Sequence, residues 1–136
     1  MSLSSLDRAL ALRGAPLFAG LSAEALIPVA ALCTEVRLGP DDTLFRAGEL
    51  GDAMYVVVDG SVRVVVGTEV ITLLGRGECV GEMAALDWEP RSATVVADGP
   101  ALLVRLGRNE LMDLLRDHPE LVRSLALVLA NRIRAM

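Results

Sequence analysis

The sequence of 136 residues carries a formal net charge of −5 at pH 7, so it offers no general electrostatic attraction to nucleic acid or to anionic membranes. Its length fits one domain with a sizeable core and excludes two domains of ordinary size. Hydrophobic residues make up 53% of the chain and aromatic residues only 3%, so we expect a core of Val, Leu and Ala.

Cellular location is indicated by what the sequence lacks. No segment approaches the ~18 uninterrupted apolar residues of a membrane-spanning helix. Arg8 and Arg13 interrupt the apolar run at the N-terminus, so no signal peptide is expected. Cys33 and Cys79 lie far apart among apolar neighbours, which favours buried free thiols. The sequence therefore predicts a cytoplasmic protein that, as this chain alone, binds neither membrane nor nucleic acid.

Two short helices are expected before the first strand. An Ala/Leu-rich run after Ser5 ends at Gly14, a residue typical of helix ends. Ser22 is the expected N-cap of a second helix over residues 24–32, which tolerates Pro28 near its first turns.

Eight short segments, many of them β-branched, follow between turn residues. They cover residues 34–38, 43–46, 54–58, 62–66, 70–74, 78–80, 93–97 and 101–106. Asp59-Gly60 predicts a β-hairpin between two of them, and Gly67-Thr68 predicts another tight turn. Strands at this spacing predict a mainly β fold, an antiparallel jelly-roll (double-stranded β-helix) barrel.

Two helices are predicted after the barrel. The first starts at Gly107, and Pro119 occupies a first-turn position of the second. The second helix carries apolar residues at helical spacing: Leu121, Val122, Leu125, Val128, Leu129 and Ile133. It either packs on the barrel alone or also covers a ligand or a second subunit, as in a homodimer. The single predicted domain thus comprises N-terminal helices (1–33), a barrel (34–106) and C-terminal lid helices (107–136).

The segment from Gly81 to Thr94 places a carboxylate and a guanidinium in an apolar neighbourhood. Gly81 allows close backbone approach to a ligand. Glu82-Met83-Ala84-Ala85 has the composition of a short helical turn whose first N–H groups attract anions. Pro90 fixes the chain before Arg91, and the strand after it carries the guanidinium back toward that turn. The pattern predicts a clamp for a phosphate and a sugar.

Gly-Glu-Met-Ala, a spacer and Pro-Arg-Ser-Ala-Thr together resemble the phosphate-binding cassette of the cyclic nucleotide-binding domain family. The resemblance extends from about Phe18 to the end of the chain and implies the same jelly roll. It implies that Glu82 accepts a hydrogen bond from the ribose 2′-hydroxyl and that Arg91 pairs with the cyclic phosphate. The backbone N–H groups of Ala84 and Ala93 then complete the phosphate cradle. The implied function is a second-messenger sensor for a cyclic purine mononucleotide.

The expected ligand site has two parts. The phosphate and ribose part comprises Gly81, Glu82, Met83, Ala84, Arg91, Ser92 and Ala93. The purine is expected to lie against Val64 and Leu73 and beneath Leu129 of the last helix. Ser92 can contact the phosphate or the exocyclic amine of a syn guanine, so cGMP stays open as a ligand. cAMP is favoured because the expected pocket contains no clear guanine reader other than Ser92.

Two alternatives belong to other classes of protein. Jelly rolls also form metal-dependent cupin enzymes, but His118 is the only histidine and cupin metals need several. Neither cysteine is expected beside His118 as a nucleophile, so no catalytic residue, metal ligand or cofactor is predicted. The second alternative is a structural or interaction domain of the same fold in which Glu82 and Arg91 pair with each other and no nucleotide binds.

Overall fold

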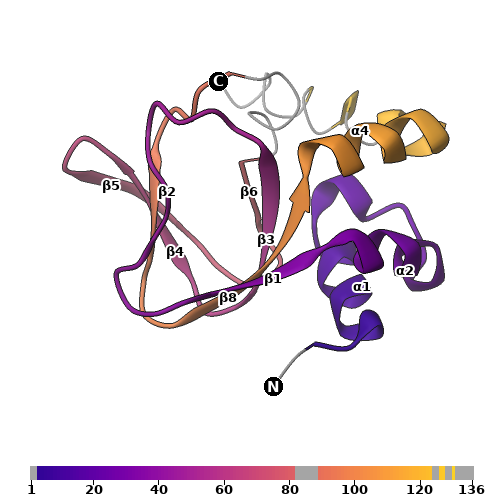
Figure 1. The fold of residues 1–136 in the computed structure, drawn as a ribbon, viewed down its shortest axis with the longest axis horizontal. Coiled ribbons are helices and arrows are strands. Elements are labelled where there is room, and N and C mark those ends of the chain that lie inside the picture. The colour runs from indigo at the N-terminus through magenta and orange to yellow at the C-terminus, as the bar shows by residue number, and fades with distance from the viewer. Residues whose placement is uncertain (1–2, 82–88, 124–125, 128–129, 131–136) are drawn as a thin grey trace.

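The computed structural model describes residues 3–81, 89–123, 126–127 and 130 (Figure 1). Within them, eight strands form two four-stranded antiparallel sheets. The strands are β1 Thr34–Leu38, β2 Thr43–Phe45, β3 Ala53–Asp59, β4 Val62–Val66, β5 Glu69–Leu74, β6 Cys79–Val80, β7 Thr94–Ala97 and β8 Ala101–Gly107. The sheet orders are β1-β8-β3-β6 and β2-β7-β4-β5. The chain changes sheet at every connection except β4–β5, which confirms the predicted jelly roll.

The predicted hairpin at Asp59-Gly60 is wrong. β3 pairs with β6 and β8, whereas β4 pairs with β5 and β7, so this turn carries the chain from one sheet to the other. Gly60 has a φ of +78°, and a Cβ at this position would collide with the carbonyl oxygen of Pro100. Glycine is needed here because two crossovers approach closely. The Gly67-Thr68 turn does join paired strands, with Val66 opposite Glu69.

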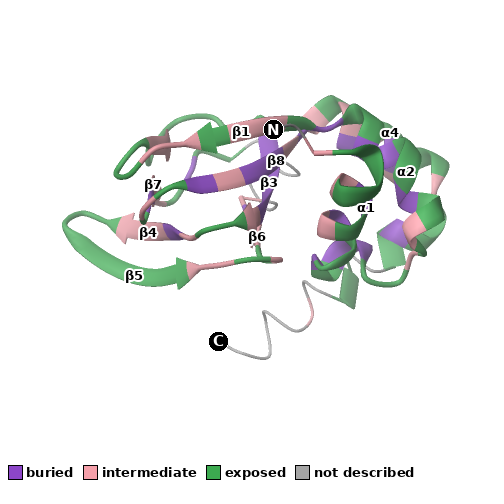
Figure 2. Ribbon diagram, turned by 90° about the horizontal axis from the view of Figure 1, so that it is seen from below, coloured by how far each residue is buried: buried purple, intermediate pink, exposed green. Residues whose placement is uncertain are grey.

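Helices cover one side of the barrel. α1 spans Ser5–Arg13 and α2 spans Ala23–Leu32, with a short 3₁₀ helix at Pro16–Phe18 between them. Ser4 caps α1, because its side chain accepts a hydrogen bond from the backbone N–H of Asp7 in a capping box. Figure 2 shows these helices on one side of the barrel and the β4–β5 hairpin, in which β5 is largely exposed, on the other.

Two buried clusters lie on opposite faces of the sheet β1-β8-β3-β6. The cluster under the helices includes Phe18, Leu26, Met54, Val104, Leu106 and Leu111. The inner cluster, inside the barrel, includes Phe45, Tyr55, Val57, Val62, Val95 and Leu103. Cys33 is a buried free thiol, as predicted, and burial raises the pKa of this thiol to about 11. The alternation of Leu103 and Val104 between the clusters follows from the two-residue period of a strand.

The C-terminal helices begin directly after β8. α4 spans Arg108–Asp117, and a further helix starts at Pro119, as predicted. Leu121 is buried under the helices, whereas Val122 and Leu127 are more than half exposed. Four of the apolar residues at helical spacing lie outside the described residues: Leu125, Val128, Leu129 and Ile133. Within the described part of the chain, no helix has the length and apolarity needed to cross a membrane.

Candidate ligand-binding site

The backbone at Arg91 is fixed by the loop between β2 and β3. The Arg91 N–H donates to the carbonyl oxygen of Glu49 at 2.7 Å, and the Gly48 N–H donates to the carbonyl oxygen of Arg91 at 2.8 Å. Pro90 forms an isolated bridge with Leu50 just before this point. These contacts hold the second half of the cassette against the end of the barrel where β3 and β7 begin.

The guanidinium of Arg91 is buried and held by two backbone carbonyls. The residue is 5% exposed. Its Nη1 donates to the carbonyl oxygen of Gly81 at 3.0 Å, and its Nη2 donates to that of Ala53 at 2.7 Å. Gly81 has a φ of +77°, and a Cβ there would collide with Arg91 Nη1. Position 81 therefore requires glycine for its backbone conformation and for the room that the arginine takes.

No carboxylate forms an ion pair with Arg91 among the described residues. Burial lowers the pKa of its guanidinium, an effect that the nearby carboxylates of Asp52 and Glu49 partly oppose. Arg91 Nε is buried without a hydrogen-bond partner in the described part of the chain. Hydrogen bonds to described residues thus use only two of the five N–H groups of a guanidinium. A buried cation with spare donors is suited to receive an anion.

The other predicted cassette residues fall into two groups. Ser92 is exposed and Ala93 is half-buried, immediately before β7. Thr94, the first residue of β7, accepts a hydrogen bond from the Ala47 N–H through Oγ1 at 3.0 Å. Glu82, Met83 and Ala84 lie outside the described residues. Of the predicted phosphate and ribose residues, the structure therefore brings Gly81 and Arg91 into contact and places Ser92 and Ala93 beside them.

The residues predicted for the base do not share one face. Val64 packs against the inner cluster and lies opposite Thr72 of β5. Leu73 lies opposite Arg63 and is 54% exposed. Residues directly opposite each other project from the same face of a sheet, and consecutive residues of a strand project from opposite faces. Leu73 therefore shares a face with Arg63 and not with Val64. Leu129 lies outside the described residues.

Two aromatic residues that the sequence analysis did not select contact Arg91. The guanidinium carbon lies 4.0 Å from the centroid of the Phe45 ring and 6.0 Å from that of Tyr55. The signal available in the sequence was rarity, since the chain has only two Phe and one Tyr. In so aliphatic a chain, an aromatic residue on a short strand is a candidate for a specific contact.

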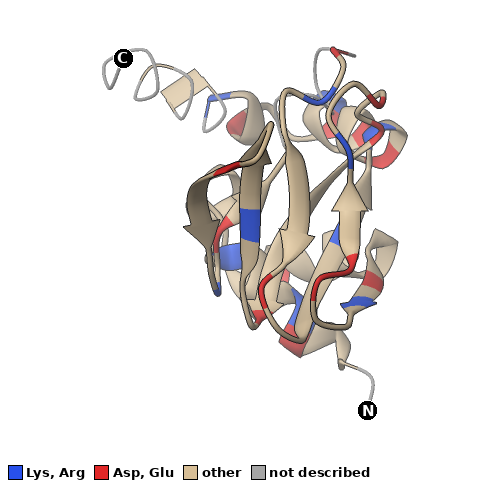
Figure 3. Ribbon diagram, turned by 90° about the vertical axis from the view of Figure 1, so that its left-hand side faces the viewer, with Lys and Arg blue, Asp and Glu red and all other residues tan. Residues whose placement is uncertain are grey.

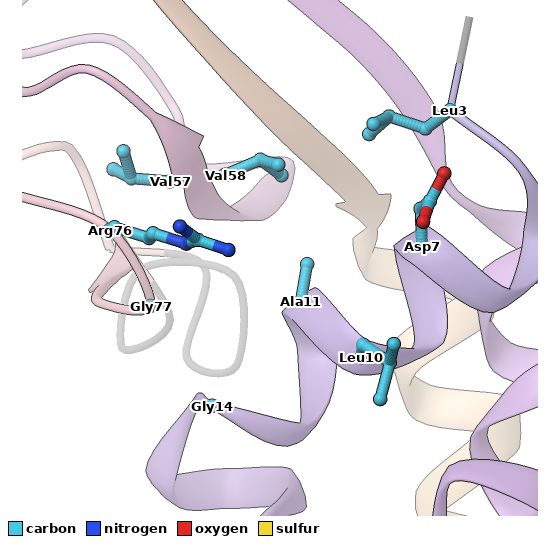
Figure 4. Close-up of a pocket in the computed structure, with 9 residues that line it drawn as sticks. All are labelled: Leu3, Asp7, Leu10, Ala11, Gly14, Val57, Val58, Arg76 and Gly77. Carbon is cyan, nitrogen blue, oxygen red and sulfur yellow. The ribbon is translucent and has the colours of Figure 1, made fainter.

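A separate cavity of about 320 Å³ lies between α1, β3 and the turn before β6 (Figure 4). It is lined by Leu3, Asp7, Leu10, Ala11, Gly14, Val57, Val58, Arg76 and Gly77. None of the predicted site residues lines it. The described residues contain no group of His, Cys, Asp or Glu that could hold a metal ion. Figure 3 shows basic and acidic positions interspersed over the loops and strands of the face in view.

The structure is that of a jelly-roll domain with a buried arginine at one end of the barrel, and known proteins are similar to it in sequence and in fold. A profile described as "Cyclic nucleotide-binding domain" matches residues 35–118. The chain is 39% identical over 129 residues to the cyclic AMP receptor protein of Thermus thermophilus, a match that covers 90% of this chain and 59% of that protein.

Solved structures show the same relationship. The N-terminal domain of a transcriptional regulator from Streptomyces coelicolor superposes with a TM-score of 0.81 at 35% identity, covering 92% of this chain and 91% of that one. The regulatory domain of Toxoplasma gondii PKA, solved with cAMP, gives 0.73 at 28% identity, covering 80% and 43%. The chain belongs to the cyclic nucleotide-binding domain family, as the cassette indicated, and spans 59% of the length of its Thermus relative.

Proposed function

We propose that this domain binds a cyclic purine mononucleotide and acts as a cytoplasmic second-messenger sensor, with cAMP favoured over cGMP. One observation carries the proposal: Arg91 is 5% exposed and forms no ion pair among the described residues. Leaving a buried cation without a counter-charge is costly. A cyclic phosphate carries one negative charge and oxygens that can accept a bidentate guanidinium contact.

The remaining roles follow the family cassette. Glu82 accepts the ribose 2′-hydroxyl, and the N–H groups of Ala84 and Ala93 complete the phosphate cradle with Arg91. Ser92 is the one residue proposed to read a guanine, so adenine is the favoured base. AMP should bind more weakly than cAMP, because its extra charge and its freed 5′ position fit a cradle for a cyclic phosphate poorly.

The output is proposed to pass through the C-terminal helices. The Asp52 carbonyl oxygen accepts a hydrogen bond from the N–H of Arg108, the first residue of α4, at 2.7 Å. The next carbonyl along the chain, that of Ala53, holds the Arg91 guanidinium. Movement of Arg91 toward a phosphate would thus disturb the segment on which α4 begins and shift an equilibrium of the lid helices about Gly107.

Neither catalysis nor DNA binding is part of the proposed activity of this chain. Dimerisation through the C-terminal helices stays a prediction, supported by the exposure of Val122 and Leu127. The Thermus relative is named as a receptor for cyclic AMP, which supports the sensor role over that of a structural domain with a self-paired cassette.

Calorimetric titration tests the proposal directly. cAMP should give a saturable heat and raise the unfolding temperature, cGMP should bind more weakly, and AMP should bind more weakly than cAMP. Absence of both heat and thermal shift with millimolar cAMP and cGMP would show that the chain is a structural domain of the same fold.

A further inference from the structure

We infer that Phe45 positions the phosphate-binding arginine: its ring holds the Arg91 guanidinium in the orientation that receives the ligand, without touching the ligand itself. The inference rests on the proposed function, because it assigns a second residue to the same site. It goes beyond the cassette, because Phe45 lies on β2, far from the cassette in sequence.

The contact geometry is that of a stacked cation. The guanidinium carbon lies 4.0 Å above the Phe45 ring, and the Tyr55 ring lies at 6.0 Å, near the outer limit of about 6 Å for such contacts. The two bonds to the carbonyls of Gly81 and Ala53 leave from the edge of the guanidinium. The ring therefore supports the cation, while the two carbonyl bonds leave three of its five N–H groups for a phosphate.

A bulge in β2 brings the ring to this position. Thr43 lies opposite Val96 and Phe45 lies opposite Val95 of β7, so two steps along β2 match one step along β7. In a regular strand Leu44 and Phe45 would face opposite sides of the sheet. Here both pack against the inner cluster, and Phe45 is only 8% exposed. Bulges commonly re-aim a side chain beside a functional site, and this one directs Phe45 beneath Arg91.

The ring also supplies what the described carboxylates do not. Because Arg91 is buried without an ion pair among the described residues, the negative face of an aromatic ring is a significant partner, and such contacts strengthen when water is excluded. An aliphatic side chain can fill the same volume but has no such face. Without the ring, the two carbonyl bonds alone hold the long arginine side chain, and part of its ordering falls to the ligand, at a cost to affinity.

The test is calorimetry of cAMP binding to the full chain carrying Phe45→Leu or Phe45→Tyr. Phe45→Leu should weaken binding by roughly 2- to 12-fold, the range expected for ordering one long side chain. Phe45→Tyr keeps the ring and should restore wild-type affinity. In an Arg91→Ala background, Phe45→Leu should cause no further loss, because Phe45 acts only through that arginine.

Leu103→Val provides the control for stability, since Leu103 is fully buried in the same inner cluster and its truncation should lower the unfolding temperature without changing affinity. If Phe45→Leu does not fold, Phe45→Met takes its place, with the same expected loss. Wild-type affinity in the folded aliphatic variant, or an equal loss in the Arg91→Ala background, overturns the inference. A wild-type chain that binds neither cyclic nucleotide overturns the proposed function as well, which separates the two failures.

Discussion

Two arginines at opposite ends of the barrel are held in opposite ways. Arg63 on β4 lies where β7 ends and pairs with Asp41 at 2.7 Å and with Asp98 at 2.9 Å. Hydrogen bonds to Asp41 and then to Asp98 raise the pKa of its guanidinium. Arg91 lies where β7 begins, and burial lowers its pKa. Its bonds go to two carbonyl oxygens and its face lies on an aromatic ring.

The difference separates an arginine that stabilises the fold through ion pairs from one that we propose to bind a ligand. All 13 basic residues of the chain are Arg, so residue type alone gives no distinction. Asp41 and Asp98 neutralise the charge of Arg63. Arg91 is buried and forms no ion pair with a carboxylate among the described residues. Substitutions at the two positions should therefore affect different measured quantities.

The largest expected effect is that of Arg91→Ala on nucleotide binding. The variant loses a charge-assisted, bidentate contact in a site shielded from water, so cAMP affinity should fall by about 2–4 kcal/mol, roughly 30- to 1000-fold. Titration calorimetry measures the loss, and thermal unfolding confirms that the variant is folded.

The matched variant is Arg63→Ala. It removes two exposed ion pairs, which contribute little in water, and it should lower stability slightly while leaving cAMP affinity unchanged. Equal affinities of the wild type and Arg91→Ala would place the ligand elsewhere. An affinity loss in Arg63→Ala would show that the two ends of the barrel are coupled.

Gly81→Ala should have the next largest effect, and it tests whether the backbone at position 81 leaves the room that the Arg91 guanidinium needs. Gly81 has a φ of +77°, and its new Cβ would meet Arg91 Nη1. We expect a loss of stability of about 1–2 kcal/mol from the left-handed backbone alone and, in addition, weaker cAMP binding because the guanidinium is displaced.

Gly67→Ala is the control for that strain. Gly67 has a φ of +64° in the β4–β5 turn, and a Cβ added there would have open space around it, with no neighbouring atom within 4 Å. Urea unfolding should show a similar loss of stability, about 1–2 kcal/mol, while calorimetry should show unchanged affinity. If Gly67→Ala weakens binding as much as Gly81→Ala does, general destabilisation rather than contact with Arg91 is the cause.

Most strands could be predicted from the sequence because each is a short apolar run between turn residues. β1 and β4 have the predicted bounds. Each of the other strands differs from its predicted bounds by one residue at one or both ends. Pairing partners could not be predicted in the same way. Asp59-Gly60 signals a tight turn in either case, and only the packing of the two sheets decides that β3 and β4 separate.

The site shows the same division between local and non-local information. The proximity of Gly81 and Arg91 could be predicted because both belong to one local motif. Phe45 could not, because its contact with Arg91 depends on a bulge in β2 and on the closure of the barrel. The position of Leu73 depends in the same way on pairing, because the register of β4 and β5 sets it opposite Arg63.

The smallest expected effect concerns Glu35 on β1, a carboxylate that its own chain neutralises, as Arg63 is neutralised. Its Oε1 accepts hydrogen bonds from the Leu3 N–H at 2.6 Å and from Arg8 at 3.3 Å, and its Oε2 pairs with Arg37 at 3.4 Å. The bond from Leu3 and then the interactions with Arg8 lower the pKa of Glu35 below its ordinary 4.5.

A carboxyl group with a lowered folded-state pKa stabilises the fold above its unfolded-state pKa and loses that contribution as the pH falls through the folded-state pKa. Glu35→Gln should therefore be less stable than the wild type near pH 7, and the difference should shrink below the ordinary pKa of 4.5. Urea unfolding at a series of pH values measures it. A difference that is constant with pH would mean that the amide disturbs packing rather than charge. cAMP affinity at pH 7 should be the same in both proteins, because Glu35 contacts the N-terminal helix region and not Arg91.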